Sequence, residues 1–111
     1  MSRKRQDFIT VEIHVFFPER GYGFGHCRNG RKYYLNIKNG VEPIPSTTGQ
    51  PTWLSRQKGG RIPTPKPGDK IRIRPRETPA GWQAMVWMHS QSFWRAFRQS
   101  REISSLEVYP A

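Results

Sequence analysis

The sequence has little with which to build a covalent or metal-linked framework. It contains one cysteine, Cys27, so no disulfide can form within the chain. No cluster of metal ligands, no catalytic grouping of serine, cysteine or paired carboxylates, and no glycine-rich phosphate loop between a strand and a helix is visible. We therefore expect a protein that is not an enzyme, carries no metal or cofactor and works in a reducing, cytoplasmic setting.

Acidic residues and long apolar runs are also scarce. Eight Asp and Glu face nineteen Lys and Arg, which gives a formal net charge of +11 over 111 residues. No run approaches the roughly 20 apolar residues that span a bilayer, and no apolar segment of a secretory signal follows the first residues. These features predict one domain, no membrane association and a polyanionic partner, of which nucleic acid is the obvious candidate.

Aromatic residues, in contrast, are plentiful: the chain has four tryptophans, four tyrosines and six phenylalanines. Three strands are predicted in the region richest in them, at residues 9–17, 22–27 and 32–37, with a hairpin turn around Asn29-Gly30. Side-chain alternation then places an aromatic surface on the outside of a small barrel. If the third strand had the opposite register, Tyr33 would replace Tyr34 on that surface, which we expect to comprise Phe16, Tyr22, Phe24 and Tyr34.

The same alternation predicts which side chains fill the barrel. The inward set of the first three strands is apolar or small and includes Val15, Phe17, Gly23, Gly25, Tyr33, Leu35 and Ile37. Cys27 follows the same alternation and is interpreted as a small core residue rather than a reactive thiol.

The remainder of the chain reads as two more strands and a C-terminal element. Residues 1–7 form a basic arm, and residues 41–67, rich in proline and glycine, are predicted to be a long loop that is basic towards its end. Residues 70–74 and 82–88 are the expected fourth and fifth strands. After residue 90 we expect an extension, 91–111, with a short helix capped by Ser92 and an irregular tail or short strand from residue 104.

Two short segments resemble signatures of the cold-shock domain family. The first is Phe16-Phe17-Pro18-Glu19-Arg20-Gly21-Tyr22-Gly23-Phe24-Gly25, with a turn one residue shorter than in the family, and the second is Tyr33-Tyr34-Leu35-Asn36-Ile37-Lys38. Residues 81–87 are a loose counterpart of the family's closing segment. The resemblance covers residues 9–88 apart from the 41–67 loop, and Asn36 and Ile37 stand where the family has a histidine and an aromatic residue.

This resemblance implies a mainly all-β fold: a five-stranded antiparallel barrel of the oligonucleotide-binding (OB) type, at residues 8–90. It also implies binding of single-stranded RNA or DNA by base stacking and phosphate contacts. The expected contacts are Phe16, Arg20, Tyr22, Phe24, Arg31, Lys32, Tyr34, Asn36 and Lys38, with His14, Trp53, Arg72 and Arg74 as a second tier.

Several of these residues also have an ordinary structural interpretation. His14 and His26 suit surface or half-buried positions, the strand-four arginines suit a solvated face, and Trp53 suits an anchor for the long loop. A second functional hypothesis is a protein-interaction module that docks onto a ribosomal, replication or transcription partner. In it the long loop and the C-terminal aromatics, Trp94 and Phe97, make the contact; these rings could equally pack the helix, extend the binding groove or join two copies.

Overall fold

The computed structural model describes residues 8–107, and these contain seven strands and one α-helix. The strands are β1 (Ile9–Phe17), β2 (Tyr22–His26), β3 (Lys32–Asn36), β4 (Val41–Ile44), β5 (Thr52–Ser55), β6 (Lys70–Thr78) and β7 (Gly81–His89), and the helix is α1 (Ser90–Glu107). Short 3₁₀ turns follow β3 and β5. The basic arm predicted for residues 1–7 and the last four residues of the predicted extension lie outside the described range.

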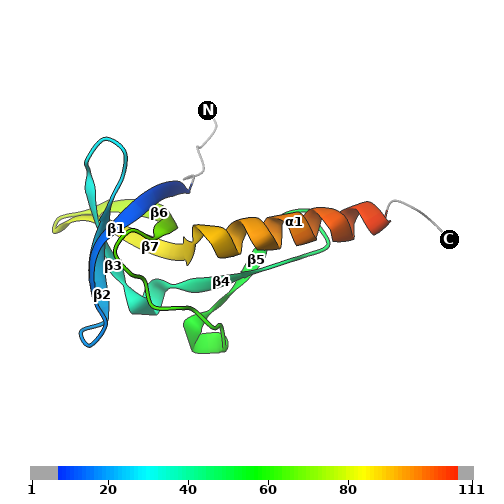
Figure 1. Ribbon diagram of the computed structural model, residues 1–111, viewed down its shortest axis with the longest axis horizontal. Helices are drawn as coiled ribbons and strands as arrows, with labels where there is room; N and C mark the ends of the chain where they lie inside the picture. The colour runs from blue at the N-terminus through cyan, green and yellow to red at the C-terminus, as the bar shows by residue number, and fades with distance from the viewer. Residues whose placement is uncertain (1–7, 108–111) are drawn as a thin grey trace.

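Five strands close into a barrel in the order β1-β2-β3-β7-β6, which confirms the prediction of a mainly β barrel (Figure 1). The barrel is not fully antiparallel as predicted, because β3 and β7 run parallel. Strand direction cannot alternate all the way round a closed ring with an odd number of strands. One parallel pair is therefore required, and it is the pair of β3 with β7, the last strand of the barrel.

The segment predicted as a loop, residues 41–67, contains a two-stranded sheet instead. Strands β4 and β5 pair antiparallel, with Pro43 opposite Trp53, and the hairpin lies beside α1 (Figure 1). Val41 and Pro43 are buried, so the hairpin gains its stability from packing rather than from a strong strand pattern. Further on, Pro65 is fully buried and the Pro63 carbonyl lies 2.8 Å from His89 Nε2, which holds this segment to the end of β7.

Helix α1 begins at Ser90 directly after β7, so the prediction that Ser92 caps it is wrong. No turn separates the strand from the helix, because β7 ends at His89 and α1 begins at the next residue. The prediction of an irregular tail or strand from residue 104 is also wrong for residues 104–107, because the helix continues to Glu107, and the rest of that segment lies outside the described residues. No helix among the described residues is long and apolar enough to cross a membrane.

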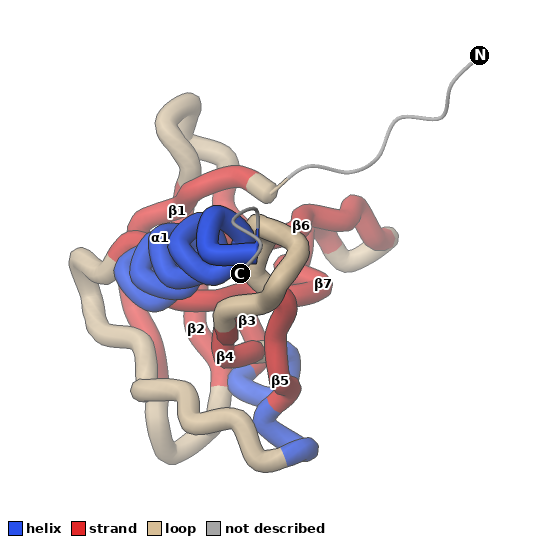
Figure 2. The backbone as a smooth tube through the Cα atoms, turned by 90° about the vertical axis from the view of Figure 1, so that its right-hand side faces the viewer, coloured by secondary structure: helices blue, strands red, loops and turns tan. Residues whose placement is uncertain are grey.

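One buried serine connects the helix to the hairpin. Ser100 is fully buried; its hydroxyl donates to the Ala96 carbonyl at 2.8 Å and accepts from the Ser46 amide at 3.0 Å. In Figure 2, turned by 90°, α1 lies in front of the barrel strands with β4 and β5 beside it. The helix therefore stands out from one end of the barrel, with the hairpin along its side.

The barrel interior is filled by side chains from β1, β3, β6 and β7, while β2 turns its two glycines, Gly23 and Gly25, inward. Trp87 is completely buried, its indole Nε1–H donates to the Asn36 carbonyl at 2.7 Å, and a Cβ added to Gly40 would collide with its ring. This bond ties β7 to the end of β3, the parallel closure of the barrel. The buried apolar set is Val11, Ile13, Phe16, Tyr33, Leu35, Ile71, Ile73, Ala84 and Trp87.

Candidate functional site

A β-bulge in β1 changes which aromatic side chains face outward. The register between β1 and β2 shifts between Ile13 and Val15, so the alternation changes phase at that point. Phe16 is 7% exposed and belongs to the core, whereas Phe17 is 37% exposed. The prediction that Phe16 lies on the outer face and Phe17 inside is therefore wrong, and the two exchange places.

The cross-strand partners of these two residues explain the exchange. Phe16 lies opposite Gly23, and Phe17 lies opposite Tyr22. Directly opposed residues of an antiparallel pair share a face of the sheet, so a buried glycine requires an inward neighbour. A Cβ on Gly23 would overlap the Phe16 ring and the Val15 carbonyl, which means that this glycine makes the room that Phe16 occupies.

Four rings form a continuous group on the outer face of β1, β2 and β3, which we call the outer aromatic cluster: Phe17, Tyr22, Phe24 and Tyr34. Ring centroids lie 5.5 Å apart for Phe17 and Tyr22, 5.7 Å for Tyr22 and Tyr34, and 5.8 Å for Phe24 and Tyr34. Tyr22, Phe24 and Tyr34 are half-buried because they pack on one another. Tyr33 is 3% exposed and points inward, so Tyr34 is the outward residue of the third strand, as expected.

Polar groups hold the edge of the outer aromatic cluster in place. The Asn36 side chain donates from Nδ2 to the Tyr34 hydroxyl at 3.1 Å and accepts from the Lys38 amide at 2.9 Å. Asn36 thus fixes the Tyr34 ring and begins the 3₁₀ turn Ile37–Asn39. The Asn36 side chain remains half-exposed beside the rings.

Cations surround this cluster. Lys32 Nζ lies 5.2 Å from the centroid of the Phe24 ring, and the Arg31 guanidinium lies 4.3 Å from that of Trp82. Arg20 and Lys38 are exposed at the same end of the barrel strands. Among the predicted first-tier residues, the structure therefore brings together all except two: Phe16, whose place is taken by Phe17, and Arg31, whose guanidinium lies over Trp82 on the side of the inward-facing Tyr33.

A shallow hollow of about 390 Å³ opens beside Phe24. His14 and His26 lie across it with ring centroids 6.0 Å apart, and Lys32 lines its rim. Both histidines are exposed, which agrees with their interpretation as surface residues. A flat ring entering this hollow would meet one aromatic face and one cation.

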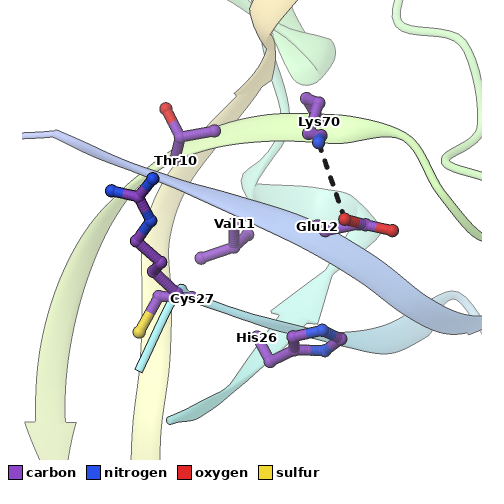
Figure 3. Close-up of a pocket in the computed structure, with 7 residues that line it drawn as sticks. Thr10, Val11, Glu12, His26, Cys27 and Lys70 are labelled. Atoms are coloured by element: carbon purple, nitrogen blue, oxygen red, sulfur yellow. Dashed lines mark ion pairs between the residues drawn. The ribbon is translucent and has the colours of Figure 1, made fainter. Parts of the chain in front are cut away.

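A second hollow, of about 560 Å³, lies next to the first and shares His26 with it (Figure 3). Thr10 and Glu12 of β1 and Lys70 of β6 line one side, and the Lys70 ammonium forms an ion pair with Glu12 at 3.5 Å. Cys27, on the other side, is half-buried against the core, and its thiol donates to Asn29 Oδ1 at 2.8 Å. Cys27 is thus a packed, hydrogen-bonded residue, in line with its predicted role.

The second-tier residues Trp53, Arg72 and Arg74 lie away from the outer aromatic cluster, on β5 and β6. Trp53 packs against Phe8, with ring centroids 5.8 Å apart, and the two arginines lie over nearby rings. Phe8 in this second group and Phe17 in the first are not among the residues predicted from the sequence. For Phe17 the signal was the inward glycine opposite Phe16; for Phe8 no sequence signal points to the contact.

Among residues 8–107, no three His, Cys, Asp or Glu side chains come together in a way that could hold a metal ion. No family model matches the chain, and no curated protein sequence matches it.

Proposed function

We propose that this protein binds single-stranded RNA or DNA through the outer aromatic cluster and the cations around it, without catalysing a reaction. The observation that carries the proposal is the position of Phe17, Tyr22, Phe24 and Tyr34 on the outside of the barrel, with the Lys32 ammonium beside Phe24. Apolar rings gathered on a surface need a partner that covers them. A partner for this surface must offer flat apolar faces together with negative charge.

Unpaired nucleotides meet both requirements. Bases stack on aromatic side chains with about 1–3 kcal/mol per base, and every base has a face that can do so. The rings of the cluster meet largely edge to face, so their planes differ and successive bases can stack on different rings. Bases inside a duplex are already stacked on each other, which is why we propose a preference for single strands.

The charge of the protein supports the same partner. A net charge of +11 favours a polyanion, and Arg20, Lys32 and Lys38 are exposed near the cluster. Each phosphate neutralised releases counterions, so binding of this kind weakens as salt rises. Asn36, beside Tyr34, can add a hydrogen bond to a base edge and with it a modest sequence preference.

We further propose that the barrel is of the OB type and related to cold-shock domains. In OB folds the face of the second and third strands binds oligonucleotides, and the outer aromatic cluster is centred on β2 and β3. The motif resemblance of residues 16–25 and 33–38 falls on these same strands. A cold-shock-like role in the cytoplasm, as a chaperone that keeps strands open or as a regulator, fits this combination.

Titration of a fluorescently labelled oligo-U or oligo-dT of about 8 nucleotides, followed by anisotropy, tests the proposal. The double variant Tyr22→Ala/Phe24→Ala removes two rings and should weaken binding by about 30-fold or more, because two stacks of about 1 kcal/mol or more are lost. Tyr22→Phe/Phe24→Tyr keeps both rings and should bind like the wild type. A duplex of the same length should bind more weakly than the single strand at equal salt.

An Ala/Ala variant that binds within twofold of the wild type would rule out the cluster as the binding surface. If the wild type binds no oligonucleotide at low salt, the second function becomes the better one: a protein-interaction module using the hairpin and α1. The observation in favour of that function is that Leu54 and Trp94 are 38% and 46% exposed on these elements.

A further inference from the structure

Two arginines on β6 lie in an unusual environment on the outer surface. Arg72 and Arg74 are two residues apart on one strand and point to the same side, so their side chains begin about 6.6 Å apart. The Arg72 guanidinium lies 4.1 Å from the Phe93 ring centroid and 5.6 Å from that of Phe8. The Arg74 guanidinium lies 4.9 Å from Phe8 and 5.8 Å from Trp53.

These guanidinium groups are partly removed from water and gain no counter-charge from the part of the chain that the structure describes. Both Nε atoms are buried and have no hydrogen-bond partner. The ion pairs among the described side chains are Lys70 with Glu12 and His89 with Asp69, and neither involves these arginines. Burial lowers the pKa of Arg72, because the charged guanidinium loses part of its hydration. Cation–π attraction to the rings offsets part of this cost of desolvation. The rings do not, however, replace the oxygen acceptors that water offers to the guanidinium N–H groups.

A purely structural role would not need this arrangement. Rings from the N-terminal segment, β5 and α1 converge here, and apolar side chains on β6 could join them without burying charged donors. Both arginines are only half-buried, and the nitrogens that are buried without a hydrogen-bond partner are their two Nε atoms. A planar fork with its base covered by rings and its tip open is well suited to a phosphate, which it can bind through two parallel hydrogen bonds.

The hollow in Figure 3 lies between the outer aromatic cluster and the surface around Arg72. His26 lines that hollow and also the one beside Phe24. At its other side Thr10 lies directly opposite Arg72 in the β1–β6 pairing. Arg28 and Lys70 line the hollow too, and its single carboxylate, Glu12, is paired with Lys70. A single-stranded nucleic acid that leaves the outer aromatic cluster would therefore pass Arg28 and Lys70 on its way to Arg72.

Resting on the proposed function, we propose that Arg72 and Arg74, with Trp53 and Trp94, form a second contact for the same single strand. The two guanidinium groups bind successive phosphates, whose separation in an extended strand is comparable to the spacing of alternate residues on β6. Trp53 and Trp94, 36% and 46% exposed, offer rings for the neighbouring bases. The bound strand then runs from β2 and β3 across β1 to β6, and the protein engages a longer segment than the cluster alone covers.

The dependence of affinity on oligonucleotide length tests this inference. We compare labelled oligo-U of about 5 and about 14 nucleotides, within the range of OB-fold site sizes. Wild-type protein should bind the longer strand at least tenfold more tightly. Arg72→Gln/Arg74→Gln should lose most of that gain and leave affinity for the short strand within about twofold. The control Arg95→Gln/Arg98→Gln, which removes the same charge from exposed positions on α1, should keep the gain.

Further variants and measurements distinguish loss of the second contact from misfolding. Arg72→Lys/Arg74→Lys keeps the charge and loses the planar fork, so it should recover only part of the gain, and thermal unfolding checks that each variant is folded. In otherwise wild-type protein, tryptophan emission should be quenched more by the long strand than by the short one. Trp53→Phe/Trp94→Phe should remove that difference.

The two proposals fail in different ways. If Tyr22→Ala/Phe24→Ala abolishes binding of the short strand while Arg72→Gln/Arg74→Gln binds the long strand as the wild type does, the second contact is wrong and the proposed function stands. Equal loss with the Arg95/Arg98 control also overturns the second contact, because general charge would then explain the gain. Absence of any single-strand binding by the wild type overturns both.

Discussion

Phe16 and Phe17 are adjacent in sequence and lie on opposite sides of the barrel wall, 7% and 37% exposed. Phe16 fills the space over Gly23, whereas Phe17 packs against Tyr22 at 5.5 Å between ring centroids. One residue therefore contributes to the core and the other to the proposed binding surface. Substitutions at these two adjacent positions should therefore distinguish an effect on stability from an effect on binding.

Alanine at these two positions should affect different properties of the protein. Phe16→Ala removes a buried ring and should lower the free energy of unfolding by about 3–5 kcal/mol. Phe17→Ala should cost about 1 kcal/mol or less, as is usual for a side chain with this exposure, yet weaken oligo-U binding by about fivefold or more through the lost stack. Urea unfolding and anisotropy titration measure the two quantities. A Phe17→Ala variant that binds normally would remove Phe17 from the site.

Gly23 should tolerate no side chain, although its backbone conformation is an ordinary one. An added Cβ would overlap the Phe16 ring and the Val15 carbonyl, so Gly23→Ala should destabilise the protein by about 1–3 kcal/mol through overpacking. Gly25→Ala is the milder substitution for comparison, because the atoms nearest to its added Cβ would lie 3.0 and 3.1 Å away. Thermal unfolding should place Gly25→Ala between the wild type and Gly23→Ala, and the reverse order would contradict this packing.

The sequence predicted the barrel strands well because their signals are local. Alternation in residues 9–13 and the glycines at 23 and 25 specify inward and outward sides without help from the rest of the chain. The bulge between Ile13 and Val15 is different. It arises from how β1 pairs with β2 at one end and with β6 at the other, and no residue in β1 marks it. For this reason the outer position was assigned to Phe16 instead of Phe17.

The hairpin β4–β5 and the start of α1 were missed for a related reason. Residues 41–67 carry prolines and weak periodicity, which is typical of a loop, and the hairpin exists because Pro43 and Val41 are covered by other elements. The tertiary bond between Ser46 and Ser100 spans 54 residues. The interpretation of Arg72 and Arg74 as a solvated face does not hold either, because both are half-buried. The rings that cover them come from three distant segments, which no local pattern brings together.

Lys32 offers a test of the electrostatic part of the proposed site. Its ammonium lies 5.2 Å from the Phe24 ring centroid, where it can contact the phosphate of a base stacked on that ring. Lys32→Gln should weaken binding of every sequence to a similar degree and reduce the slope of log K against log salt by about 0.7. Lys58→Gln, an exposed change on the 3₁₀ turn after β5, should leave the slope unchanged. An unaltered slope in Lys32→Gln would place its ammonium away from the phosphates.

Tyr33 should make the fold sensitive to alkaline pH. Burial raises the pKa of its hydroxyl above the ordinary value of 10.0, although Arg31 beside it acts in the opposite direction. In the unfolded chain the group loses its proton at about pH 10, while the folded protein still holds it. The unfolded state therefore gains stability first, and the free energy of unfolding falls as pH rises from about 10 through the raised folded value.

Phenylalanine at position 33 keeps the ring and removes this titration. Urea unfolding at about pH 8 and about pH 10.5 should show a larger loss of stability in the wild type than in Tyr33→Phe. Tyr34→Phe is the matched control, since Tyr34 is half-buried on the outer face and its loss should leave the wild-type pH dependence in place. Parallel decreases in the wild type and Tyr33→Phe would mean that the Tyr33 hydroxyl ionises equally easily in the folded and unfolded states.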